Sequence, residues 1–375
     1  MSEQQRAALD LDALIDDPET RIIVTCGAGG VGKTTTAAAL GLRAAERGRK
    51  VVVLTIDPAR RLAQSLGLTE LDNTPRAVTG VDGGRLDAMM LDMKRTFDDV
   101  VLQHATPEKA EQILANPFYV ALSSSFAGTQ EYMAMEKLGQ LHKQAERTGD
   151  WDLIVVDTPP SRSALDFLDA PERLASLLEG RFLRLLLAPA RGPFKLMSAG
   201  VSMAMSVLNK VLGTQVLTDV QTFVAAFDTL FGGFRQRAEQ TVALLREPHT
   251  AFLVVASPQN DALREASYFA ERLRAEGMPL AGVVLNRVTT TEAPELSAQR
   301  SLAAAEKLDE ADKSPLTAAV LRLHADKMHQ VVGDEKRADR FRRSHRAIAT
   351  IEVPALADDV HDLTGLRRIG DLLTA

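Results

Sequence analysis

The sequence has one cysteine and one tryptophan among 375 residues, and aromatic residues make up only 5% of it. A single cysteine, Cys26, excludes an internal disulfide framework and any metal site built from several thiolates of one chain. The amino-terminal segment is acidic and polar rather than basic and then apolar, so we expect no signal peptide. Together these absences predict a cytoplasmic protein.

Long apolar runs and an excess of cations are also absent. The best candidate for a membrane span, residues 196–209, lies between two lysines and is shorter than the roughly 20 residues that a spanning helix needs, so no transmembrane segment is predicted. The chain has 44 Lys and Arg against 50 Asp and Glu, a net charge of −6. Because no global positive field is present, we expect no nucleic-acid partner.

Short runs rich in β-branched residues alternate along the chain with helical stretches. The runs are continuously apolar, which is typical of strands buried on both faces of a parallel sheet. Their alternation with helices predicts an α/β fold with a doubly wound, mostly parallel sheet. The predicted strands are residues 21–26, 51–56, 153–157, 251–256, 280–286 and 347–354.

Two stretches, residues 94–150 and 172–248, contain too much helix for single crossovers. We therefore predict one sheet domain over residues 1–375 with an α-helical subdomain inserted at these two places. Met, Leu and Val recur near one helical face within residues 203–212. Such a face forms either the core of a helical bundle or an exposed groove for an apolar client, and the sequence leaves both readings open.

A glycine-rich segment follows the first predicted strand and precedes a helix. It contains Gly27-x-x-x-x-Gly32-Lys33-Thr34, in the strand–loop–helix context of a phosphate-binding loop. The glycines let backbone N–H groups turn toward phosphate oxygens, and the following helix adds its positive N-terminus. Lys33 is expected to contact the β- and γ-phosphates, and Thr34 to ligate Mg²⁺. The predicted nucleotide-binding residues of this loop are Gly27, Ala28, Gly29, Gly30, Val31, Gly32, Lys33, Thr34 and Thr35.

Two aspartates follow or end predicted strands at the edge of the sheet where α/β folds bind their ligands. Asp57 is expected to orient an attacking water near the γ-phosphate and to lie close to Mg²⁺, and Asp157 to hold Mg²⁺ through a coordinated water. The alternative is that each carboxylate only caps the helix or turn that follows it. The predicted catalytic residues are thus Lys33 and Asp57, and the predicted metal residues are Thr34, Asp57 and Asp157.

Five segments, in order along the chain, resemble one family. The loop GGVGKTTT, the run DPARRL from Asp57, the run DTPPSRSALDFLDAP from Asp157, the run VVLNRV around Asn286 and the segment VPALADDVHDLTGLRRIGDLL around Pro354 resemble the motifs of the arsenite-pump and tail-anchored-protein-targeting ATPases. These proteins are relatives of ParA, MinD and the nitrogenase iron protein. The resemblance implies a P-loop NTPase fold, binding of ATP and Mg²⁺, and nucleotide contacts from Asn286 and Pro354.

The resemblance also implies a function. A member of this family would hydrolyse ATP to ADP and phosphate and act as a dimeric switch that couples hydrolysis to an apolar protein client or a membrane partner. One alternative is a weakly hydrolysing regulatory subunit, paired in a heterodimer with a paralogous ATPase. Another is a partition or septum-positioning ATPase, which is disfavoured because that group lacks a large helical insertion.

The chain departs from the family pattern at several positions. Ala28 stands where the family has a signature lysine that reaches the partner's nucleotide, so a homodimer would turn over slowly unless Arg60, Arg61 or Arg162 substitutes for it. A heterodimer with a lysine-bearing paralogue is the other possibility. The zinc-binding CxxC and the arsenite-binding cysteines are absent, so we expect no arsenite chemistry. The cation-rich residues 336–346 form either a solvated helix face or a site for an anionic partner.

Overall fold

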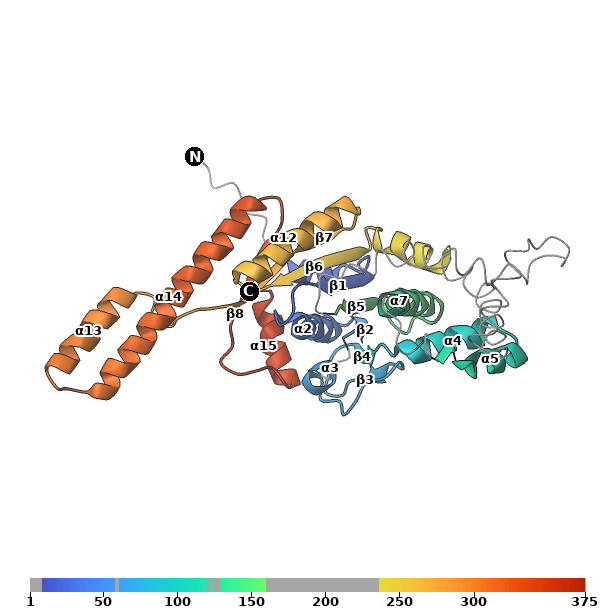
Figure 1. Ribbon diagram of the computed structural model, residues 1–375, viewed down its shortest axis with the longest axis horizontal. Helices are drawn as coiled ribbons and strands as arrows, with labels where there is room; N and C mark the ends of the chain where they lie inside the picture. Colours follow the sequence, from blue (N-terminus) through green and yellow to red (C-terminus); the bar gives the residue numbers. More distant parts are fainter. Residues whose placement is uncertain are drawn as a thin grey trace, which may run out of the picture.

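The computed structural model describes residues 9–57, 61–117, 119–120, 123, 129–159 and 236–374. Within these residues the centre of the molecule is an eight-stranded sheet, with the order β3-β4-β2-β5-β1-β6-β7-β8 (Figure 1). Neighbouring strands are parallel except β3, which is antiparallel to β4. The strands are β1 (Ile22–Cys26), β2 (Lys50–Thr55), β3 (Arg76–Ala77), β4 (Arg85–Met90), β5 (Leu153–Asp157), β6 (Thr250–Ala256), β7 (Leu280–Val288) and β8 (Thr350–Pro354).

The six strands predicted from apolar runs are confirmed as β1, β2, β5, β6, β7 and β8, and the α/β class with a mostly parallel sheet is confirmed with them. Strands β3 and β4 were not predicted. The apolar run of β4 is interrupted by Asp87, which is fully buried. Its carboxylate is paired with Arg85 at 2.7 Å and accepts a hydrogen bond from Trp151 Nε1 at 2.6 Å. A buried polar residue with such partners is tolerated inside a sheet. Because it interrupts the run of apolar residues, the strand was not recognised from the sequence.

Helices cover both faces of the sheet, because its strands are apolar on both sides. Along β1, Ile22 and Val24 contribute to the core on one face, and Ile23 contributes to the core on the other. The first core is completed by α4 (Met93–His104), α5 (Pro107–Leu114), α7 (Thr129–Thr148) and most of the buried face of α12 (Asn260–Ala275). The second is completed by α1 (Leu11–Asp16), α2 (Lys33–Glu46), α3 (Arg61–Ser65) and α15 (Leu363–Leu372).

The two stretches predicted as inserted helices differ in what the structure describes. In residues 94–150, helices α4, α5 and α7 are present, and the buried side chains of α7 join the same core as the strands. In residues 172–248, the structure describes only a helix over residues 236–245 and the turn after it. Residues 203–212, with their proposed bundle core or client groove, lie outside the described residues.

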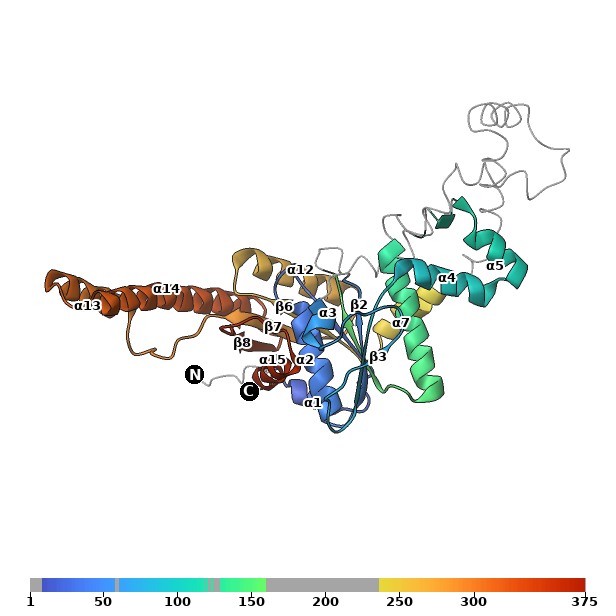
Figure 2. The ribbon, with the colours of Figure 1, turned by 90° about the horizontal axis from the view of Figure 1, so that it is seen from below.

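A helical hairpin between β7 and β8 was not predicted. It consists of α13 (Ala298–Glu310) and the long α14 (Pro315–Ser344), and its far end projects well beyond the sheet (Figures 1 and 2). Only the C-terminal part of α14 reaches the sheet core, through Ala338 and Phe341. The cation-rich residues 336–346 are therefore the end of α14 nearest the sheet.

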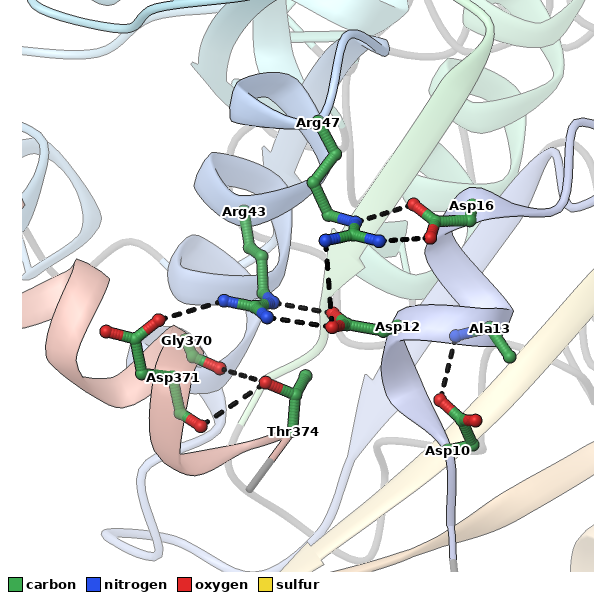
Figure 3. A network of polar contacts seen from close by, with 9 residues as sticks. All are labelled: Asp10, Asp12, Ala13, Asp16, Arg43, Arg47, Gly370, Asp371 and Thr374. Atoms are coloured by element: carbon green, nitrogen blue, oxygen red, sulfur yellow. Dashed lines mark hydrogen bonds and ion pairs between the residues drawn. The ribbon is translucent and has the colours of Figure 1, made fainter.

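An ionic cluster joins α2 to α1 and α15 (Figure 3). Arg43 on α2 pairs with Asp12 of α1 at 2.6 Å and with Asp371 of α15 at 3.0 Å. One turn further along α2, Arg47 pairs with Asp16 and Asp12. The hydrogen bond from Arg43 holds the pKa of Asp12 below its ordinary value. These contacts hold α2, which begins directly after the glycine-rich loop, against α1 and α15.

No helix among the described residues is long and apolar enough to cross a bilayer. The candidate span at residues 196–209 lies outside them.

Candidate functional site

The loop between β1 and α2 needs glycine at two positions for steric reasons. Gly27 has φ +148°, and a Cβ there would lie 2.0 Å from the carbonyl oxygen of Val255 on β6. Gly32, the residue before α2, has φ +97°, and a Cβ there would lie 2.2 Å from Asn286 Nδ2 on β7. The loop is therefore pressed against the carboxyl ends of two neighbouring strands, which determines where its N–H groups and the start of α2 lie.

Lys33 folds back across this loop. Its Nζ donates a hydrogen bond to the carbonyl oxygen of Ala28 at 2.8 Å, and the residue is 5% exposed. Burial lowers the pKa of its ammonium group, and the nearby Asp157 carboxylate acts in the opposite direction. An anion in the loop would give this buried cation a stronger partner than a neutral carbonyl.

Asp157 lies beneath the loop at the end of β5 and is completely buried. Its Oδ2 accepts hydrogen bonds from Thr34 Oγ1 at 2.8 Å and from Thr55 Oγ1 at 2.9 Å. Burial raises the pKa of Asp157 to about 6, although the two hydroxyl donors favour its ionised form. The other oxygen, Oδ1, is buried and accepts no hydrogen bond among the described residues.

The arrangement around Asp157 fits a hard divalent cation. A buried carboxylate oxygen without a hydrogen-bond donor is a costly arrangement unless something else occupies its lone pairs. Thr34 supplies a hydroxyl oxygen next to it, and oxygen ligands of these two kinds are those that Mg²⁺ prefers. Thr34 and Asp157 are thus brought together as the sequence predicted. A bound Mg²⁺ would give Asp157 Oδ1 the partner that it lacks among the described residues.

Asp57 follows β2 in a short bend beside the loop. Its backbone N–H donates to Thr55 Oγ1 at 3.2 Å, so a single threonine contacts both aspartates of the site. Asp57 lines the same cavity as Lys33 and Thr34, and its charge contributes to the pKa of both Lys33 and Asp157. The structure therefore brings together all three predicted metal residues at one edge of the sheet.

Asn286 and Arg287 reach the loop from the end of β7. Asn286 Nδ2 donates to the carbonyl oxygen of Val31 at 2.8 Å, and a guanidinium N–H of Arg287 donates to that of Gly30 at 2.8 Å. Arg287 does so from a left-handed backbone conformation, with φ +60°. Asn286 was predicted from the sequence, whereas Arg287 was not, although it directly follows Asn286.

A cavity of about 1070 Å³ opens beside the loop and can hold a nucleotide-sized molecule. Asp57 and the loop residues lie on its polar side, whereas Leu356, Val360 and Ile369 add apolar surface. Among the lining residues, Gln64 and Ser65 of α3 and those of the segment 355–361 were not named as site residues from the sequence. Of the predicted site residues, those that line it are Gly29, Gly30, Gly32, Lys33, Thr34, Thr35, Asp57, Asn286 and Pro354.

Ala28 lies on the other side of the loop. It lines a second cavity of about 540 Å³, together with Val31, Arg287 and Arg337. Of the three arginines considered as substitutes for the missing lysine, Arg61 lines the larger cavity, while Arg60 and Arg162 lie outside the described residues.

Cys26 ends β1 just before the loop, and its side chain is inaccessible. Burial raises the pKa of its thiol to about 12, because the thiolate would lie in an apolar environment. A neutral, buried thiol is a poor ligand for a soft metal or metalloid ion. Cys26 is therefore poorly placed to bind arsenite.

Comparison with known proteins identifies one family and several relatives of this chain. The sequence model of a family described as anion-transporting ATPases matches residues 20–314. A protein named ATPase ASNA1 homolog from Entamoeba dispar is 26% identical over 74% of this chain and 80% of its own length. ATPase GET3 from Kluyveromyces lactis is 30% identical over 45% of this chain, and the match spans half of the GET3 length. A protein of Aquifex aeolicus described as an arsenical pump-driving ATPase is 24% identical over 72% of this chain and 64% of its own length.

Proposed function

The chain belongs to the anion-transporting ATPase family and is an ATPase, and we propose that it hydrolyses ATP to ADP and phosphate in the cavity beside residues 27–35. We further propose that it acts in the cytoplasm as a nucleotide-driven dimeric switch that couples hydrolysis to binding or delivery of a client or membrane partner. The observation that carries the catalytic part is the orphan Oδ1 of buried Asp157, next to Thr34 and below a loop shaped for phosphates.

Binding of the triphosphate would rest on the loop and on the start of α2. Backbone N–H groups of residues 29–34 would face the phosphates, and the N-terminus of α2 would add its partial positive charge. Lys33 would exchange its hydrogen bond with the carbonyl oxygen of Ala28 for the β- and γ-phosphate oxygens. Asn286, which is hydrogen-bonded to the loop, and Pro354 would contact the base, and Leu356 offers apolar surface in the same cavity.

Hydrolysis would depend on charge stabilisation and on one positioned water. Thr34 and Asp157 would hold Mg²⁺, which neutralises charge on the β- and γ-phosphates when bound. Asp57 would orient a water so that its oxygen attacks the γ-phosphorus while the bond to the β–γ bridging oxygen breaks, leaving ADP and inorganic phosphate. Lys33 would stabilise the negative charge that spreads over the equatorial oxygens.

A second candidate function is favoured by Ala28. Neither site of a homodimer would receive a lysine from the partner's loop, whereas a heterodimer with a lysine-bearing paralogue would supply one cation to this chain's site. The chain would then serve as a weakly hydrolysing regulatory subunit. A cation supplied in trans is worth roughly 10³- to 10⁵-fold in related phosphoryl-transfer sites, so the two candidates differ strongly in rate.

Steady-state phosphate release by the chain alone, and by the chain mixed with such a paralogue, distinguishes the candidates. The dimeric switch predicts turnover by the chain alone that Lys33→Ala abolishes, together with weaker ATP binding by that variant. The regulatory subunit predicts slow release by the chain alone and a large increase on mixing. No ATP binding by the wild-type chain under either condition would contradict both candidates.

A further inference from the structure

A third cavity lies away from the phosphate-binding loop, between α12 and the C-terminal part of α14. Its volume is about 380 Å³, enough for a small ligand or part of one. Leu263 and Phe341, both of which belong to the sheet core, contribute its apolar surface. The cavity contains the inner end of the cation-rich segment 336–346, whose role the ATPase site leaves open.

Arginine side chains from two helices converge on this cavity. Arg264 comes from α12, and Arg337 and Arg340 come from successive turns of α14. No Asp or Glu is among the residues that line it. Burial lowers the pKa of the fourth basic residue, His345, so the arginines carry the positive charge at neutral pH.

Two of these guanidinium groups have little or no acidic compensation. Among the described residues, Arg340 takes part in none of the ion pairs or side-chain hydrogen bonds and is exposed. In the described part of the chain Arg264 pairs only with Asp261, at 3.4 Å, and both side chains are at least 75% exposed. Exposed pairs of this kind are worth little, so Arg264 is available to another anion.

The remaining groups of the cavity are fixed in place. Arg337 donates to the carbonyl oxygen of Pro258 and to Asp334, which holds its guanidinium against the rim. The His345 ring lies 2.9 Å from Ser267 Oγ through Nε2 and packs on Phe341, with ring centroids 4.7 Å apart. A pocket whose walls are already ordered loses less entropy when a ligand binds.

Neutral donors complete the site. Asn260 and Ser344 line the cavity, and their side chains make none of the side-chain hydrogen bonds found among the described residues. An amide, a hydroxyl and guanidinium groups from two directions match the several acceptor oxygens of a phosphate group better than the two of a carboxylate.

We propose that this cavity, formed by Arg264, Arg337 and Arg340 with Asn260 and Ser344, binds a phosphate monoester, separately from the nucleotide bound at residues 27–35. The phosphate would contact Arg340 and Arg264 from two sides, and a small organic part of the ligand would rest on Phe341 and Leu263. The same chemistry occurs in a soluble phosphate ester and in the headgroup of phosphatidic acid.

Equilibrium dialysis of the full chain against labelled inorganic phosphate tests this site. A non-hydrolysable ATP analogue with Mg²⁺ is present at saturation, so that the loop at residues 27–35 takes up no phosphate. We expect one saturable site per chain, with affinity reduced at least tenfold by Arg340→Ala. Arg343→Ala removes another exposed cation of α14 that does not line the cavity, and it should leave the affinity unchanged.

A parallel experiment with vesicles identifies the source of the phosphate. Phosphatidylcholine vesicles with and without phosphatidic acid are sedimented with the wild-type chain and both variants. Binding of either probe that Arg340→Ala weakens and Arg343→Ala preserves supports the site, and the probe that binds shows whether the ligand is soluble or a headgroup. Binding of neither probe, or equal loss in the two variants, would overturn the proposal. Because Arg340 is exposed, its removal should not change the thermal stability of the chain.

Discussion

Gly27 and Gly30 lie three residues apart in the same loop, but their surroundings differ. A Cβ at Gly27 would overlap the backbone oxygen of Val255 at 2.0 Å, whereas a Cβ at Gly30 meets nothing within 4 Å. Gly27→Ala should therefore lower the free energy of unfolding by about 3 kcal/mol or more, because backbone cannot move aside as a side chain can. Gly30→Ala should cost only about 1 kcal/mol, from its positive φ. Chemical denaturation of both variants measures the difference, and equal losses would contradict the observed packing.

Thr55 offers a test of the residues around Asp157. Thr55→Val keeps the shape of the side chain but removes one of the two hydroxyl groups that donate to Asp157 Oδ2. Substitution of a group that orients a metal ligand commonly lowers metal affinity by 10- to 100-fold. We expect the Mg²⁺ concentration for half-maximal ATP hydrolysis to rise about tenfold in this variant.

Thr250→Val is the matched control for Thr55→Val. Thr250 is also a buried strand threonine, but its hydroxyl donates to the carbonyl oxygen of Leu244, remote from the site. Both variants should lose stability to a similar extent, about 1 kcal/mol. An equal Mg²⁺ requirement in the two variants would contradict the proposal that the Thr55 hydroxyl orients Asp157 for Mg²⁺ binding.

Single residues of the site differ in how far the sequence predicts them. Lys33 and Thr34 are predicted because one local pattern places them at the start of a helix after a strand. Gln64 and Arg287 line the same cavity from α3 and the end of β7, and neither was identified as a site residue from the sequence. Their proximity to the loop depends on tertiary contacts, such as the hydrogen bond from Arg287 to Gly30.

At the scale of elements, the ionic cluster of α1, α2 and α15 allows a pH experiment. Hydrogen bonding to Arg43 lowers the pKa of Asp12 in the folded chain, so its carboxylate contributes stability above the unfolded pKa, near 4. That contribution is lost as pH falls through the lower, folded pKa. Asp12→Asn should therefore be less stable than the wild type at pH 7, by about 1 kcal/mol, and the difference should shrink below pH 4.

Asp16→Asn provides the control within the same cluster. Asp16 and its partner Arg47 are more exposed than Asp12 and Arg43, with side-chain exposures of 45% and 37%. Exposed ion pairs contribute little, so this variant should be close to wild type at neutral pH. Urea denaturation across the pH range compares the two variants. An Asp12→Asn deficit that persists unchanged below its folded pKa would exclude the ionic explanation.

The elements themselves were predictable where burial was uniform. Strands β1, β2, β5 and β6 are buried along nearly their whole length, so their composition alone identifies them, whereas β8 is only partly buried and carries the exposed Glu352. Strand β4 carries buried Asp87, and β3 is a two-residue antiparallel edge, so neither has a clear apolar run. The hairpin of α13 and α14 was missed because most of its surface is exposed, including Leu316 and Leu323 of α14, which are 78% and 68% exposed.

At the scale of the whole molecule, the order of the strands in the sheet determines which residues lie around the loop at residues 27–35. Strand β1 lies between β5 and β6, so the loop that follows it meets Asp157 on one side and the backbone of Val255 on the other. The return of the chain through β7 and β8 then brings Asn286 and residues 354–361 to the same edge. The sequence predicted the strands and their carboxyl edge, but segments hundreds of residues apart become neighbours only through this order.

The central claim is that Asp57 orients water toward ATP bound in the cavity beside residues 27–35. The most direct test is a single-turnover measurement of phosphate release, together with ATP affinity, for Asp57→Asn and for Asp82→Asn, which makes the same change at an exposed position. We predict that ATP affinity stays within roughly threefold of wild type in both variants. Phosphate release should fall by about 10²-fold or more in Asp57→Asn alone. Equal release rates in the wild-type chain and Asp57→Asn would contradict the claim.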